Sequence, residues 1–122
     1  MARIIVYQYD KCGTCKKALR WLDANEVAYD AVDITQSPPS KQELRRVLAK
    51  SGLPIRKLFN TSGAAYREGG YGKRLETLSE DEALAELAGN GRLIKRPLVV
   101  GPALALVGFR EADYAAAFGR AS

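Results

Sequence analysis

The sequence has no histidine and two cysteines in its 122 residues. Without histidine, the chain lacks the commonest general base and the commonest metal ligand at neutral pH. A tetrahedral zinc site needs four ligands, so two thiols would require Asp10, Asp113 or a second copy of the chain to complete it. A permanent disulfide is equally unexpected in a reducing cytosol. The remaining interpretation of the cysteine pair is redox chemistry.

Long apolar runs are absent as well. Nothing in the sequence approaches the roughly 20 apolar residues of a membrane span. The N-terminal "MARIIVYQYD" has one basic residue and lacks the apolar core of a signal peptide. We therefore expect a cytoplasmic protein with no membrane association. Its 47% hydrophobic and 27% charged residues are typical of one soluble globular domain.

The charge balance is basic, with 19 Lys and Arg against 14 Asp and Glu and a net charge of +5. This modest excess has two interpretations: a solvated basic surface, or a site for an anionic ligand or partner. No recognition helix and no strip of alternating basic and aromatic residues indicates direct nucleic-acid binding.

The stretch "YDKCGTCKKALRWL" holds both cysteines, Cys12 and Cys15. Before it, residues 3–9 alternate with a period of two, which is typical of a largely buried strand. From Thr14 or Cys15 the apolar spacing becomes helical, and residues 27–34 alternate again. The order strand, cysteine turn, helix, strand predicts a βαβ unit.

Helices are predicted between residues 40 and 90. Ser40 with Glu43, and Ser79 with Glu82, have the spacing of capping boxes at helix starts. The segment "LPIRKLFN" between them has Pro54 near its start and predicts a short helix. The glycine-rich stretch that follows is expected to be mostly loop.

The C-terminal part predicts a β-hairpin and a final helix. Residues 98–100 and 103–109 are apolar runs separated by a Gly-Pro turn. The last helix places Tyr114 and Phe118 on one face. Strands at both ends of the chain with helices between them indicate an α/β protein with a mixed sheet.

The expected position of Cys12, between a strand and a helix start, favours its thiolate. Unpaired amides of a first helical turn point at such a sulfur, and the helix dipole adds about half a positive charge. Both effects lower the pKa of a thiol. Gly13 leaves the approach open, and Thr14 can serve as a cap or a hydrogen-bond donor. Cys15, one turn further on, can resolve a mixed disulfide formed at Cys12.

Lys16 and Lys17 occupy the first turn, where cations oppose the helix dipole at a cost of about 0.3–1 kcal/mol each. Their placement suits an anion at the helix start, although side chains pointing to solvent would need no such ligand. Structural or incidental cysteines are the alternative to a redox centre. The Cys-x-x-Cys spacing between a strand and an amphipathic helix favours the redox centre.

Further motifs are "PPSKQELRRVLAKSGLPIRKLFNTSG", "LIKRPLVV" and "GFREADY". With the cysteine motif, they resemble the glutaredoxin-coupled arsenate reductase family and its Spx-type relatives over about residues 3–118. The resemblance implies one domain over residues 1–122 with a thioredoxin-like fold. Such a fold has a mixed four-stranded sheet flanked by helices, here with a helical insertion at about residues 40–90 after the first βαβ unit. It also implies that Pro97 is a cis proline facing the cysteine loop.

In the reductases of that family, a cysteine attacks arsenate and three arginines hold the oxyanion. Cys12 matches the cysteine, and Arg96 and Arg110 match two of the arginines. The third position holds Asn60, a neutral residue. Losing one charge-assisted partner costs about 1.5–3 kcal/mol, so we expect weak arsenate turnover or none.

The resemblance implies a site that needs no bound metal. Lys57 and Arg67 are candidates to replace the missing charge. The catalytic residues are Cys12, Cys15 and Arg96, and the substrate-binding residues are Gly13, Thr14, Asn60, Pro97 and Arg110.

Two functions follow from the resemblance. The first is a monomeric thiol-dependent reductase with no bound cofactor, supplied with electrons by glutathione, glutaredoxin or thioredoxin. The second is a redox-sensing regulator of the Spx type, which binds the C-terminal domain of the RNA polymerase α subunit. Cys15 departs from the reductases, which commonly carry serine at that position, and matches the regulators, which carry a Cys-x-x-Cys switch.

Overall fold

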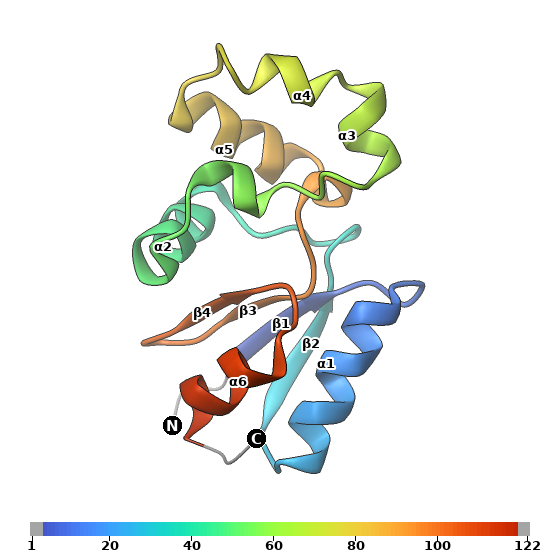
Figure 1. Cartoon of the computed structure of the whole chain (residues 1–122), viewed down its shortest axis with the longest axis vertical. Coiled ribbons are helices and arrows are strands. Elements are labelled where there is room, and N and C mark those ends of the chain that lie inside the picture. The colour runs from blue at the N-terminus through green and yellow to red at the C-terminus, as the bar shows by residue number, and fades with distance from the viewer. Residues whose placement is uncertain (1–3, 120–122) are drawn as a thin grey trace.

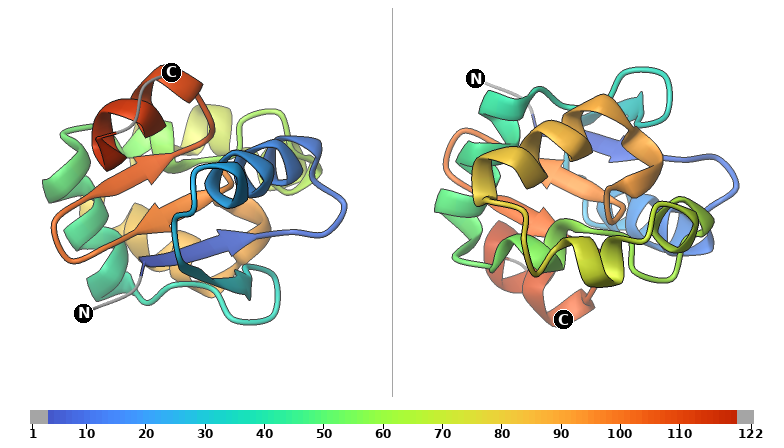
Figure 2. Two further views of the ribbon diagram at one scale, coloured as in Figure 1. Left: turned by 90° about the horizontal axis from the view of Figure 1, so that it is seen from below. Right: turned by 90° about the horizontal axis from the view of Figure 1, so that it is seen from above.

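The computed structural model describes residues 4–119, in which the strands form one mixed sheet of order β2-β1-β3-β4. β1 and β2 are parallel, whereas β3 is antiparallel to both of its neighbours. Helices α1 and α6 cover one face of the sheet, and the helices between β2 and β3 cover the other (Figures 1 and 2). The strands are β1 (Ile4–Gln8), β2 (Tyr29–Asp33), β3 (Leu98–Val100) and β4 (Ala105–Val107).

This arrangement confirms the α/β class and the thioredoxin-like fold, with a helical insertion after the first βαβ unit. None of the helices found between residues 4 and 119 is both long and apolar enough to span a membrane. The helices are α1 (Gly13–Ala24), α2 (Lys41–Ser51), η1 (Ile55–Leu58), α3 (Ala64–Glu68), α4 (Tyr71–Arg74), α5 (Glu80–Gly89), η2 (Gly91–Leu93) and α6 (Glu111–Phe118).

Strand boundaries are tighter than the alternation predicted. β1 starts at Ile4, the first described residue, so the expected start at Arg3 lies outside the described residues. The second strand was expected over residues 27–34 and covers Tyr29–Asp33, which is the length that pairs with β1. Residues 103 and 104 fall in the hairpin turn rather than in β4.

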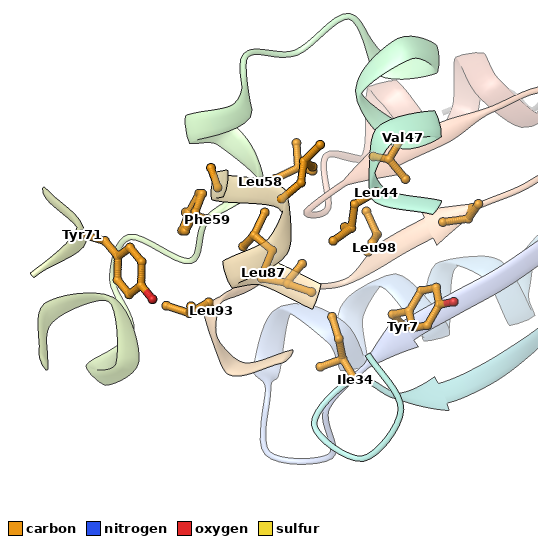
Figure 3. Close-up of a cluster of buried hydrophobic side chains, with 14 residues drawn as sticks. Tyr7, Ile34, Leu44, Val47, Leu58, Phe59, Tyr71, Leu87, Leu93 and Leu98 are labelled. Carbon is orange, nitrogen blue, oxygen red and sulfur yellow. The ribbon is translucent and has the colours of Figure 1, made fainter. Parts of the chain in front are cut away.

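Alternation along β1 divides its side chains between two cores. Ile4 and Val6 pack with Trp21 of α1 and Tyr114 of α6. Tyr7 faces the insertion, where its cluster is built mainly from the insertion helices. Figure 3 shows this second cluster, whose labelled members are Tyr7, Ile34, Leu44, Val47, Leu58, Phe59, Tyr71, Leu87, Leu93 and Leu98. A strand buried on both faces is the central element of the fold.

One of the two predicted capping boxes is incomplete. Ser79 and Glu82 form the full reciprocal pair at the start of α5. Ser40 caps α2 through the Glu43 amide, but the Glu43 carboxylate instead accepts a 2.8 Å hydrogen bond from the Tyr7 hydroxyl. The prediction of a capping box at Ser40 was therefore wrong, because a partner from β1 draws the carboxylate toward the sheet.

Glu43→Ala should lower the free energy of unfolding by about 1–3 kcal/mol, because it leaves the hydroxyl of the buried Tyr7 without its acceptor. Urea unfolding measures the change. Gln42→Ala, on the exposed side of the same helix, is the matched control and should shift stability by less than about 0.5 kcal/mol. Equal unfolding midpoints for the two variants would show that the contact does not hold the insertion to the sheet.

Candidate active site

Cys12 is the N-cap residue of α1, and its sulfur is the capping acceptor. Its backbone is extended (φ −101°, ψ 112°), and the Cys15 amide donates to Cys12 Sγ at 3.2 Å. The Cys12 amide donates to the Tyr9 carbonyl at 3.0 Å, which fixes the turn after β1. A sulfur in the place usually taken by a serine or aspartate oxygen receives the partial positive charge of the helix start.

Arg96 is the cation that acts on this sulfur. It immediately precedes Pro97, which leads into β3, the strand paired with β1. The Arg96-Pro97 peptide bond is cis, as the resemblance implied. The guanidinium lies 5.2 Å from the centre of the Tyr9 ring. Its Nε is buried and has no hydrogen-bond partner among residues 4–119. A buried donor without a partner is an available contact for a ligand.

The two thiols have opposite pKa shifts. Burial by itself raises the pKa of Cys12, but hydrogen bonds from the Cys15 thiol and amide, together with Arg96, outweigh burial and lower it. Complete burial and the hydrogen bond to Cys12 raise the pKa of Cys15 to about 12. Cys12 is therefore the more reactive thiol at neutral pH, in the order expected from the helix start.

A small cleft of about 220 Å³ is lined by Arg96, the residue that also acts on Cys12. We call it the Arg92–Arg96 cleft; its walls are Tyr9, Thr35, Asn60, Gly63, Ala64, Ala65, Arg92 and Arg96. Two backbone hydrogen bonds, from the Asn60 amide to the Leu93 carbonyl and from the Lys95 amide to the Leu58 carbonyl, join the segments on either side. They bring Asn60 to the same cleft as Arg96, although 36 positions separate them in the sequence.

Two of the predicted site residues, Arg110 and Thr14, lie elsewhere or have a different role, whereas Gly13 is placed as expected. Arg110 is exposed, pairs with Asp113 at 3.9 Å and lines another cavity beside β4. Thr14 is the exposed second residue of α1, so the capping role falls to the Cys12 sulfur instead. Gly13 begins α1, and a methyl group there would meet nothing within 4 Å. The approach to Cys12 is therefore open, as expected.

The candidates proposed to replace the missing cation are also misplaced. Lys57 lines the cavity beside β4, and Arg67 donates to the Ser62 carbonyl. Instead, Arg92 is the second cation of the cleft, with its guanidinium 5.9 Å from the centre of the Tyr9 ring. Sequence reasoning missed Arg92 and Tyr9. No spacing in the sequence indicated Arg92, because the helical turn at this point covers only Gly91–Leu93 and does not extend to Arg96.

The family model of the ArsC family matches residues 7–117. The chain belongs to the ArsC family. It is 46% identical to the uncharacterised protein YusI of Bacillus subtilis, over 88% of this chain and 92% of that protein. Among solved structures, a possible arsenate reductase from Streptococcus mutans is 43% identical with a TM-score of 0.86, covering 93% of this chain and 98% of that one. An ArsC-family-related protein from Bacteroides fragilis has a TM-score of 0.89 and 42% identity, over 92% and 94% of the two chains.

More distant members of the ArsC family carry two kinds of name. An arsenate reductase of Rhizobium meliloti is 29% identical over 81% of this chain and 69% of its own length. The global transcriptional regulator Spx of Streptococcus agalactiae is 25% identical over 88% of this chain and 77% of its own. The family therefore includes both reductases and regulators, as the resemblance implied.

Arg96→Gln should move the alkylation of Cys12 to higher pH, because a cation that lowers the thiol pKa has been removed. Iodoacetamide labelling against pH, read on each cysteine peptide by mass spectrometry, measures this. Arg20→Gln, an exposed change on α1, is the control and should leave the curve in place. Preferential labelling of Cys15 at pH 6, or an unchanged curve in Arg96→Gln, would contradict the assigned roles.

Proposed function

We propose that this protein is a thiol-dependent reductase in which Cys12 is the nucleophile and Cys15 the resolving thiol. The observation that supports it most is the Cys12 sulfur at the start of α1, which accepts from the Cys15 amide and lies within reach of Arg96. These contacts favour the thiolate, the form that attacks. A structural pair of cysteines would need neither the cation nor the open approach over Gly13.

In the first step, the Cys12 thiolate attacks one sulfur of a disulfide substrate. A new sulfur–sulfur bond forms, the substrate bond breaks, and the departing thiolate takes a proton from water. In the second step, the Cys15 proton leaves to solvent, the Cys15 sulfur attacks Cys12, and the bound substrate departs as a thiolate. Two electrons have then passed to the substrate, and the protein holds a Cys12–Cys15 disulfide.

The high pKa of Cys15 suits this order of steps. Burial raises it most, and the hydrogen bond to Cys12 and the charge of that sulfur raise it further. Once Cys12 is bound to substrate, its sulfur no longer carries a charge, and both of those contributions disappear. Cys15 thus becomes easier to deprotonate after the mixed disulfide has formed.

The Arg92–Arg96 cleft would hold an anionic part of the substrate. Arg96 reaches both the thiol and the cleft, and Asn60 supplies an amide dipole from the opposite wall. Charge-assisted contacts of this kind are the stronger hydrogen bonds available to a protein. We assign Gly13, Thr14 and Pro97 to the surroundings of the reacting sulfur, and Arg110 to a more remote contact.

An external thiol would return the protein to its reduced state. We propose glutathione, glutaredoxin or thioredoxin as the reductant and the cytoplasm as the place of action, with the protein working as a monomer. A second thiol within the chain lessens the need for glutathione as the resolving partner, because Cys15 already supplies it.

A second candidate function is a redox-sensing regulator that binds the RNA polymerase α subunit. It is favoured by the Cys-x-x-Cys pair and by the similarity to Spx over 88% of this chain. In such a regulator the Cys12–Cys15 disulfide would change a binding surface rather than reduce a substrate. The two functions therefore differ in whether the thiols touch the partner.

Cys15→Ser should accumulate mixed disulfides at Cys12, because the resolving thiol is absent while the nucleophile remains. Affinity purification under non-reducing conditions, followed by mass spectrometry of what a reductant releases, measures this. The double variant Cys12→Ser, Cys15→Ser is the matched control and should release nothing. Recovery of the polymerase α subunit by both variants, without any disulfide, would favour the regulator and contradict the reductase.

Arsenate should be a poor substrate, and Asn60→Arg should improve it about ten- to a hundredfold by supplying a full charge to the cleft. Coupled reduction of arsenate with glutathione and glutaredoxin measures the rate. Thr61→Arg adds the same charge at the next position, which lines a different cavity, and should bring no gain. Fast turnover by the unmodified protein, lost in Cys12→Ser, would show that Arg92 and Arg96 suffice for arsenate.

A further inference from the structure

A cavity of about 490 Å³ lies along the open edge of the sheet, and neither cysteine lines it. Its floor is β4, the last strand of the sheet order. One wall comes from the end of α2 and from η1, and the other from α6, which lie on opposite faces of the sheet (Figure 1). We call it the β4 groove; it is lined by Ser51, Leu53, Lys57, Lys95, Ala105, Leu106, Val107, Gly108, Arg110, Asp113, Tyr114 and Ala116.

Two residues of β4 direct their backbone amide and carbonyl groups into this groove. The hairpin bonds from Gly101 to Leu104 and from Gly108 to Pro97 fix which positions of β4 face β3. Because antiparallel pairs alternate, the amide and carbonyl groups of Ala105 and Val107 face outward. Within residues 4–119, no group donates to them or accepts from them.

The edge is short, at three residues, but its sequence does not block pairing. β4 reads Ala-Leu-Val, contains no Lys, Pro or bulge, and pairs regularly along its length. Leu53 stands on the wall and, among residues 4–119, is the large aliphatic side chain left exposed, at 36%. Unpaired edge groups beside an apolar wall are the features by which an extended peptide adds to a sheet.

The rim of the groove is positively charged. Lys57, Lys95 and Arg110 contribute three cations, and Asp113 is the one acid in the lining. The pair between Arg110 and Asp113 is 3.9 Å long and well exposed, so it holds Arg110 weakly. This surplus of positive charge favours an acidic partner and opposes a second copy of the chain, whose own groove and net charge of +5 would repel it.

We propose that the β4 groove binds an extended acidic segment of a partner protein as an added strand. The segment pairs with the outward groups of Ala105 and Val107, and its carboxylates meet Lys57, Lys95 and Arg110. This site is separate from the Arg92–Arg96 cleft and does not depend on thiol chemistry. It gives the partner a contact that persists while Cys12 reacts.

The test uses a synthetic probe, Ac-Glu-Val-Asp-Val-Glu-Val-Asp-NH2, and the full chain labelled with ¹⁵N. We expect saturable binding that perturbs the amides of Ala105 and Val107 and slows their hydrogen exchange. N-methylation of alternate residues of the probe shows which half of its backbone amides faces β4. One alternate set should abolish binding and the other should leave it, because half of the probe amides face β4.

Charge is tested on the protein. The double variant Lys57→Glu, Lys95→Glu should weaken binding of the probe at least about tenfold. Lys73→Glu, on α4 outside the groove, is the control and should have little effect. Cys12→Ser should bind the probe normally, so failure of the reductase proposal would leave this result unchanged.

Several outcomes would overturn the proposal. They are no binding of the probe at millimolar concentration, equal binding of a Lys-Val-Lys-Val probe, or equal binding after N-methylation of either set. Competition by a single-stranded oligonucleotide that matches the probe in every variant would indicate a general polyanion surface. Concentration-dependent dimerisation that protects Ala105 and Val107 without any probe would show that a second copy occupies the edge.

Discussion

The hydrogen bond from the Cys15 amide to the Cys12 sulfur is the contact on which the site depends. It exists because β1 ends at Gln8 and α1 begins at Gly13, which leaves Cys12 in the N-cap position. The cap serves the helix and the chemistry together, since the same amide that needs a partner at the helix start stabilises a thiolate. Cys15 then falls one turn inward, fully buried, where it stays protonated.

Arg96 completes this arrangement because the sheet brings distant parts of the chain to the end of β1. β3 pairs with β1, and the residue before the cis proline therefore arrives beside Tyr9 and the cysteine loop. The bridge between Phe59 and Ile94 fixes the other side, so that the insertion supplies one wall of the cleft. The insertion is thus part of the site as well as a cover for the sheet.

Much of the fold could be predicted from local patterns. The alternation around Val6, the helical spacing around Trp21 and the hairpin after Pro97 each reflect how a single element is buried, and all three were confirmed. The cis bond at Pro97 followed from the resemblance alone, because nothing local distinguishes it from a trans proline.

The errors share a different cause, namely contacts made between elements. Glu43 was expected at the cap of its own helix, but Tyr7 on the sheet draws its carboxylate away. Arg110 was expected at the anion site, but it follows β4 in the chain and lines the β4 groove. Arg92 was not predicted at all, because its place beside Arg96 depends on η2 and on the bridge at Ile94. The contacts that these side chains make depend on strand register and on how the helices pack against the sheet, and the spacing of residues in the sequence does not specify either.

If Cys12 and Cys15 form a dithiol couple that passes two electrons, the pair has a measurable reduction potential. Equilibration in glutathione buffers of defined ratio, with acid quenching and mass spectrometry, gives the potential. We expect one reversible intramolecular disulfide with a potential of roughly −300 to −180 mV, within reach of cytosolic reductants. If no Cys12–Cys15 disulfide formed even under strong oxidant, the pair could not pass two electrons, and the account would be wrong.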